Sequence, residues 1–370
     1  MSHQMTSKER VKTALTRQGL PDRVPIQFDL CRHKLEEFSH IYAIPVHYTQ
    51  AYYEDVTYRL SGNELRLAMG SDCVIVGASL PRGYQHARDE QGRVVNEFGM
   101  TMQQGELYMD LVGYPLAHVK RVEDVEAYDF PDPLSGNRYD DAAMYIDKYG
   151  QEYFIWGDVE VTLFALMRNL VGMEKLLLDM ADGAPYVDVL ADKCQAFSLA
   201  VATRLVDLGV DGVWAGDDYG DQNNLLISPA MWRRYFKERH REMYAALKSR
   251  NPAVIIAHHS DGAVAKILDE WVDAGLEVIN PVQPGVPGHE PADLKLQFGD
   301  RLSFWGGIDQ QQLLPFGSPE EISSAVKRRV EVLGQGGGYM IAPAHIIQAD
   351  TPAENLEAFL RAAKLYGKYT

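Results

Sequence analysis

Short apolar runs alternate with longer stretches in which apolar residues recur at helical spacing, and this pattern covers nearly the whole chain. Most of the short runs are continuously apolar, which is typical of parallel strands covered by helices on both faces. The runs predict eight strands, at residues 24–28, 73–76, 153–156, 212–215, 254–257, 278–280, 302–305 and 339–342. Helix starts are also marked, because Ser318-Pro319 and Thr351-Pro352 each place a capping hydroxyl before a proline and acidic residues.

Eight strands separated by helices indicate the α/β class and a (β/α)8 TIM barrel. The interval 80–138 is too long for a simple crossover, so we expect it to hold an insertion over the barrel mouth. No linker or low-complexity tract interrupts the chain, and we expect a single domain over residues 1–370. A doubly wound open sheet is the alternative, although no glycine-rich phosphate-binding segment follows an early strand.

Charge and composition exclude several function classes. The net charge is -16 and the longest basic run is Lys327-Arg328-Arg329, which argues against a nucleic-acid-binding protein. No apolar stretch is long enough to cross a bilayer, and the first ten residues lack the apolar core of a secretory signal, so we expect a cytoplasmic protein. The three cysteines are widely spaced and odd in number, which argues against a disulfide framework or a thiolate zinc cluster.

Polar residues follow most of the predicted strands. In a barrel of this kind, catalytic groups lie at the carboxyl ends of the strands, where the loops converge. Carboxylates that gather in one cavity repel each other, so they either take up protons or recruit a cation. A divalent metal would also give the histidines a role. The candidate positions are Asp29, Ser79, Asp158, Glu160, Asp217, Asp218, His258, His259, Asp261, Gln283, Asp309 and His345.

Each candidate also has a structural interpretation. Asp217 and Asp218 could satisfy backbone donors in a tight turn, and Asp309 could cap the following helix. His258 and His259 are adjacent, so on a strand they point to opposite faces and only one of them can face the mouth. Solvated loop carboxylates are the alternative interpretation of Asp29 and Glu160.

Several segments carry a family resemblance. They include Thr6-Ser7-Lys8-Glu9-Arg10-Val11, Asp129-Phe130-Pro131-Asp132-Pro133, Asn280-Pro281-Val282-Gln283-Pro284, Phe304-Trp305-Gly306-Gly307-Ile308-Asp309 and Thr351-Pro352-Ala353-Glu354-Asn355. In combination, from about residue 6 to the C-terminus, the chain resembles the uroporphyrinogen decarboxylase superfamily. The resemblance implies a (β/α)8 barrel, in agreement with the strand count.

The superfamily contains decarboxylases and corrinoid-linked methyltransferases. The arginine-rich stretch that follows the first strand of the decarboxylases is absent here, and Ser79 stands where they carry an aspartate. His345 matches their histidine, and decarboxylation of a porphyrinogen or another acidic substrate is the alternative function. The methyltransferases bind zinc through a His-x-Cys pair and a later cysteine. His259-Ser260-Asp261 and His345 fall on those positions.

The resemblance therefore implies a metal site made of His259, Asp261 and His345, with zinc as the default ion and iron as the alternative. Our leading hypothesis is a metal-dependent methyltransferase that demethylates a small O- or N-methylated compound. The methyl group would pass to a corrinoid carried by a partner protein, and the superfamily also suggests a homodimer. A barrel that binds a ligand without turnover is the third possibility.

Roles follow from this hypothesis. His345, Glu160 and Asp217 are the expected catalytic residues, with Glu160 as a fourth ligand or a proton donor. The expected substrate-binding residues are Asp29, Asp158, Asp218, Tyr219, Gln283 and Asp309.

Overall fold

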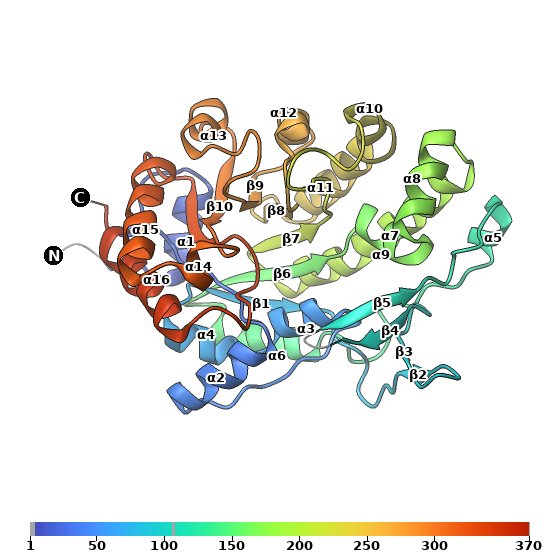
Figure 1. Cartoon of the computed structure of the whole chain (residues 1–370), viewed down its shortest axis with the longest axis horizontal. Coiled ribbons are helices and arrows are strands. Elements are labelled where there is room, and N and C mark those ends of the chain that lie inside the picture. The colour runs from blue at the N-terminus through green and yellow to red at the C-terminus, as the bar shows by residue number, and fades with distance from the viewer. Residues whose placement is uncertain (1–3, 106–107, 370) are drawn as a thin grey trace.

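A parallel sheet of seven strands forms the centre of the computed structural model, which describes residues 4–105 and 108–369 (Figure 1). The strands lie side by side in the order in which they occur in the chain, and the sheet is curled. Nearly every strand residue is buried, which explains why the runs are continuously apolar. The strands are β1 (Cys73–Gly77), β6 (Phe154–Glu160), β7 (Gly212–Gly216), β8 (Ile255–His259), β9 (Val278–Val282), β10 (Ser303–Ile308) and β11 (Tyr339–Pro343).

Helices surround this sheet, and within the described residues none is long and apolar enough to cross a membrane. The helices that come before β7 in the chain are α1 (Ser7–Leu15), α2 (Arg32–Tyr42), α3 (Glu54–Leu60), α4 (Asn63–Met69), α5 (Val122–Glu126), α6 (Asp140–Tyr149), α7 (Phe164–Val171), α8 (Met173–Asp182) and α9 (Tyr186–Leu208). The remaining ones are α10 (Pro229–Trp232), the π-helix η1 (Arg233–Lys237), α11 (Glu238–Arg250), α12 (Ala265–Asp273), α13 (Pro291–Phe298), α14 (Leu313–Phe316), α15 (Pro319–Leu333) and α16 (Ala353–Tyr366).

Seven of the eight predicted strands are confirmed, and the first one, at residues 24–28, is wrong as a regular strand. This segment makes only isolated parallel bridges to the β11 side, through Ile26 and Leu30. On its other side, Asp72 N–H donates to Ile26 O, while the Ile26 N–H donates to the Asp72 carboxylate at 2.8 Å. A side chain thus replaces a ladder partner, and Pro25 has no N–H to offer. The irregular segment spans the interval between the two edges of the sheet.

The predicted insertion is confirmed as a separate antiparallel sheet at one side of the molecule (Figure 1). Its strands are β2 (Ala87–Arg88), β3 (Val94–Val95), β4 (Thr101–Gln104) and β5 (Met109–Gly113). Next to β5, the Tyr108 hydroxyl donates to the side chain of Gln348, which lies in the loop after β11. The insertion therefore contacts the loop that also carries His345.

Three tryptophans fill the inner face of the parallel sheet. Trp305 packs against Trp156 and Trp214, with ring centroids 5.0 and 4.3 Å apart. All three side chains are buried, and smaller residues from β1, β8, β9 and β11 complete this cluster. Polar side chains can therefore gather only beyond the tryptophans, at the carboxyl ends of the strands.

Candidate metal centre

The polar residues at the strand ends divide between the two faces of the sheet. Because successive strand residues point to opposite faces, Asp158 and Glu160 share the inner face with Trp156. On β8, the ring of His259 lies 6.3 Å from that of Trp214, so His259 is also the inner residue. His258 is the outer one and packs 4.7 Å from the ring of Trp271 in α12.

A hydrogen bond from a neighbouring strand fixes the orientation of the His259 ring. Its Nδ1–H donates to Asn280 Oδ1 at 2.8 Å, an assignment that follows because the amide oxygen can only accept. In the neutral ring the lone pair is therefore on Nε2, which faces the carboxylates. Metal-binding histidines are held in this way, with the second nitrogen bonded to an oxygen acceptor.

Three carboxylates surround His259 Nε2. The distances are 3.8 Å to Glu160 Oε1, 3.6 Å to Asp218 Oδ1 and 3.6 Å to Asp261 Oδ1. His345 Nε2 lies 3.7 Å from the other oxygen of Asp261. These separations are too long for good hydrogen bonds. They are close to the value of about 3.4 Å between two ligands of a tetrahedral zinc ion.

The structure thus brings together the three expected ligands. His259, Asp261 and His345 each offer one ligand atom, and these atoms all lie within 4.8 Å of one another. The two imidazole rings have centroids 5.6 Å apart. His259 is buried, whereas Asp261 and His345 are partly exposed, so a metal held here would remain accessible from one side.

Two buried arginines, which the sequence did not suggest as site residues, neutralise the inner carboxylates. Arg59 in α3 pairs with Glu160 and lies 3.5 Å from oxygens of both Asp29 and Asp158. Its guanidinium also stacks over the ring of Trp214, 4.1 Å from the centroid. Arg66 in α4 pairs with Asp29. Apolar residues flank each arginine, in Tyr58-Arg59-Leu60 and Leu65-Arg66-Leu67, and that was the available signal of burial.

The two aspartates nearest the site differ in their electrostatic surroundings. Burial raises the pKa of Asp158 to about 6, although Arg59 acts in the opposite direction. Burial would also raise the pKa of Asp218, but His259, Arg168 and the Asp261 N–H together hold it below its ordinary value. Asp218 is therefore ionised at neutral pH and contributes negative charge beside His259.

A cavity of about 240 Å³ opens at this centre. Asp261 and His345 line it together with Gln283 and Asp309, two of the expected substrate-binding residues. The Gln283 side chain is fixed, because its Oε1 accepts from the Gly262 N–H at 2.8 Å. The other lining residues are Gln222, Pro284, Gln310, Gln311 and Ala344.

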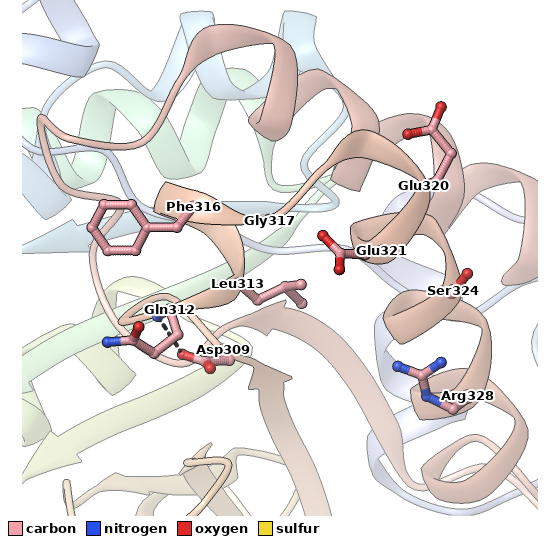
Figure 2. Close-up of a pocket in the computed structure, with 9 residues that line it drawn as sticks. All are labelled: Asp309, Gln312, Leu313, Phe316, Gly317, Glu320, Glu321, Ser324 and Arg328. Atoms are coloured by element: carbon pink, nitrogen blue, oxygen red, sulfur yellow. Dashed lines mark hydrogen bonds between the residues drawn. The ribbon is translucent and has the colours of Figure 1, made fainter.

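Asp309 also borders a wider surface groove of about 640 Å³ (Figure 2). One of its carboxylate oxygens accepts from the N–H groups of Gln311 and Gln312, at 2.7 and 3.1 Å. Part of this carboxylate therefore stabilises the turn before α14, as the capping interpretation expected. The groove continues past Phe316 toward Glu320 in α15 (Figure 2).

Asp217 and Tyr219 lie away from the cavity, although both were expected to act there. One Asp217 oxygen accepts from the N–H groups of Leu163 and Ala165, each at 2.8 Å, at the start of α7. The Tyr219 ring is fully buried, and its hydroxyl lies 2.8 Å from His240 Nε2.

Comparison with known proteins gives relatives of two kinds. The methylcobamide:CoM methyltransferase MtaA of Methanosarcina barkeri is 24% identical over 220 residues, which cover 60% of this chain and 60% of that protein. A uroporphyrinogen decarboxylase of Coxiella burnetii is 24% identical over 181 residues, which cover 47% and 46%. The chain thus matches less than two thirds of the length of these relatives.

Over the whole chain, the fold is similar to that of a solved methyltransferase from Methanosarcina mazei. The TM-score is 0.73 at 19% identity, and the match covers 98% of this chain and 99% of that one. The sequence pattern of uroporphyrinogen decarboxylase (URO-D) matches residues 96–366, which is most of the chain. The resemblance inferred from the motifs is therefore confirmed, and the chain belongs to the uroporphyrinogen decarboxylase (URO-D) family.

Proposed function

We propose that this protein is a metal-dependent methyltransferase that demethylates a small O- or N-methylated compound and passes the methyl group to a corrinoid on a partner protein. The observation that carries the proposal is the convergence of His259, Asp261 and His345 beside a cavity. The MtaA relative is named as a methylcobamide:CoM methyltransferase, and this likeness supports a corrinoid partner.

The donor set fits a divalent metal. Two imidazoles and a carboxylate suit zinc, with iron as the second choice, and leave a coordination position open. Asn280 holds His259 with its Nε2 lone pair directed at the carboxylates. When bound, the metal would supply Lewis acidity toward an oxygen or nitrogen of the substrate. Hard ligands of this kind favour a substrate oxygen or nitrogen over a thiol.

The residues around the centre would handle the substrate and a proton. As the bond between the methyl carbon and the heteroatom breaks, the heteroatom keeps the electron pair and gains a proton. Glu160 is our candidate for the proton donor or a fourth ligand, since its Oε1 lies 3.8 Å from His259 Nε2. Gln283 and Asp309 line the cavity, and we propose that they orient the substrate.

Decarboxylation of an acidic substrate finds less support. Among the described residues that line the cavity there is no lysine or arginine. The buried Arg59 and Arg66 are already paired with Asp29 and other carboxylates. Substrate carboxylates would therefore meet Asp261 and Asp309 with no basic side chain beside them.

The first test is the metal content of protein purified without a metal-affinity tag, followed by an assay of methyl transfer. Reduced free cobalamin replaces the corrinoid of the partner, and methoxylated compounds and methylamines serve as donors. We expect bound zinc or iron, and formation of methylcobalamin that is visible in the absorption spectrum. His259→Ala and His345→Ala should each lose the metal of this site and reduce the rate at least about 100-fold.

The matched control is His33→Ala, since His33 is an exposed histidine in α2. It should keep both the metal and the rate of the unmodified protein. If the site binds no metal and takes none up during titration, the Lewis-acid chemistry is wrong. If metal is bound but no donor is demethylated, a barrel that binds without turnover is the better description.

A further inference from the structure

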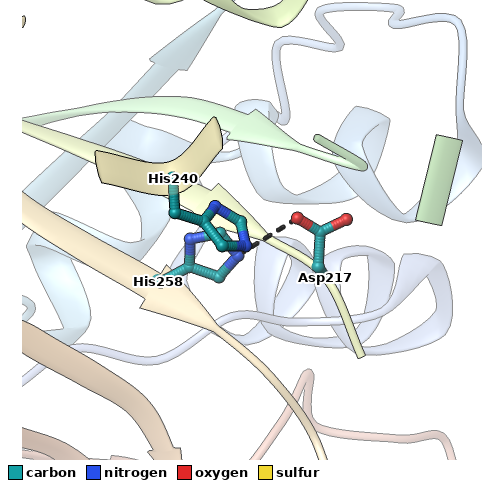
Figure 3. A group of neighbouring side chains, drawn as sticks. All are labelled: Asp217, His240 and His258. Carbon is teal, nitrogen blue, oxygen red and sulfur yellow. Dashed lines mark ion pairs between the residues drawn. The ribbon is translucent and has the colours of Figure 1, made fainter. Parts of the chain in front are cut away.

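A second group of metal-ligating side chains lies on the outer face of the sheet. Asp217 follows β7, His258 belongs to β8, and His240 comes from α11, which covers both strands (Figure 3). Each offers one ligand atom, and these atoms all lie within 4.8 Å of one another. All three side chains are at most 1% exposed, so this group is separate from the partly open cavity.

A tyrosine hydroxyl lies against one ring nitrogen of each histidine. Tyr244 Oη is 2.7 Å from His258 Nδ1, and Tyr219 Oη is 2.8 Å from His240 Nε2. Tyr244 Oη also accepts from the Trp271 Nε1–H at 3.0 Å. An oxygen that accepts from His258 Nδ1–H leaves the lone pair of that ring on Nε2. Metal-bound histidines are held by second partners of this kind.

Two polar atoms in this group have no hydrogen-bond partner among the described residues. They are His258 Nε2 and Asp217 Oδ2, which are 3.3 Å apart, as the dashed line in Figure 3 shows. In spite of this short separation the two atoms form no hydrogen bond with each other. A buried carboxylate oxygen without a partner is costly. A separation of 3.3 Å is close to the value of about 3.4 Å between two ligands of one tetrahedral ion.

We propose that Asp217, His240 and His258 bind a second divalent metal ion of the zinc class, with a structural role. Because the group is enclosed, the ion has no route to a substrate. It links β7, β8 and α11, and through Asp217 it also secures the start of α7. This role for Asp217 differs from the catalytic one suggested by the sequence.

The test leaves the buried group intact and removes the proposed catalytic site instead. The unmodified protein and the His259→Ala/His345→Ala double variant are produced in zinc-supplemented medium, purified without a tag and analysed for metals. We expect two zinc equivalents in the first and one in the second. Removal of the remaining zinc from the double variant, by a chelator under mild denaturation, should lower its midpoint of thermal unfolding.

Variants of the buried group then locate the ion. His258→Asn and His240→Asn should each reduce the metal content by one equivalent, whereas His33→Asn, at an exposed position, should not. If the double variant holds no metal even after refolding with excess zinc, the proposal is overturned and the group is a proton-bridged network. It is also overturned if the zinc of the double variant persists when His258→Asn and His240→Asn are added. One zinc equivalent in both the unmodified protein and the double variant would instead contradict the catalytic site and support this one.

Discussion

At the scale of single residues, Asn280 controls the orientation of the His259 ring. Its amide oxygen accepts from Nδ1–H, and this leaves Nε2 free for a metal. We expect Asn280→Ala to weaken metal binding at the proposed catalytic site about 10- to 100-fold, because the ring loses its outer partner. Titration with zinc against a competing chelator measures the change. Asn280→Asp keeps an acceptor at this position and should retain tight binding, and equal losses in both variants would contradict this role.

A second prediction at this scale concerns Asp158. Burial raises its pKa to about 6, above the ordinary value of 3.8. Between these two pH values the folded chain keeps a proton that the unfolded chain has released. The stability that this residue contributes is therefore complete below about pH 4 and is lost as the pH rises through 6.

Asp158→Asn removes this titration. We expect the free energy of unfolding of the variant, relative to the unmodified protein, to rise between pH 4 and 6 and then to stay constant. Urea denaturation at pH 4.5, 5.5 and 7 measures it. Other buried groups titrate equally in both proteins and cancel in the difference. A difference that does not change with pH would show that Asp158 has an ordinary pKa.

At the scale of elements, Asp72 substitutes for a strand. Its carboxylate accepts from the Ile26 N–H and pairs with Arg10 and Arg23 at 2.7 Å, and the side chain is buried. We expect Asp72→Asn to reduce the free energy of unfolding by about 3 kcal/mol, because Arg23 loses its counter-charge and the buried Arg10 keeps only Asp22. Asp269→Asn, which breaks an exposed pair with Arg301, should cost less than about 1 kcal/mol. Equal effects of the two substitutions would contradict the assigned role of Asp72.

The pattern of apolar residues predicted the positions of the strands better than it predicted the residues of the candidate site. Seven continuous runs became parallel strands because burial on both faces requires apolar residues at every position. The run at 24–28 differs from these in containing Pro25 and Gln27, and its pairing depends on Asp72; no local pattern reveals a side chain that acts as a ladder partner. Hydrophobicity reports burial, and it does not report which hydrogen bonds a buried segment makes.

The sequence identified the candidate site residues that lie at the ends of strands, and it missed those that lie in helices. His259 ends β8, Asp261 and His345 come within two residues of strand ends, and the curled parallel sheet brings these ends together. Arg59 reaches Asp158 across 99 residues of sequence, so chain spacing could not connect the two. His240 is the third residue of the helix α11, and from the sequence alone such a histidine is assigned to the surface or the core.

At the scale of the whole molecule, metal binding at the proposed sites would be coupled to folding. An ion that binds only the folded chain stabilises it by about 2.7 kcal/mol when its free concentration is 100 times its dissociation constant. We expect a chelator to lower the midpoint of thermal unfolding, and added zinc to restore it in a concentration-dependent manner. Calorimetry with and without the chelator measures the shift. Identical midpoints under both conditions would mean that the partly open site of His259, Asp261 and His345 holds no ion, since the enclosed site releases its metal only under mild denaturation.

The two proposed sites are neighbours along the chain as well as in space, since β8 carries His258 on its outer face and His259 on its inner face. If the strand slid by one residue, the two imidazoles would exchange faces and both sites would lose their ligand together. Both proposed sites therefore constrain the number of residues in this segment. Among relatives that keep both histidines, we expect insertions and deletions to accumulate in the turns on either side and never within residues 255–261.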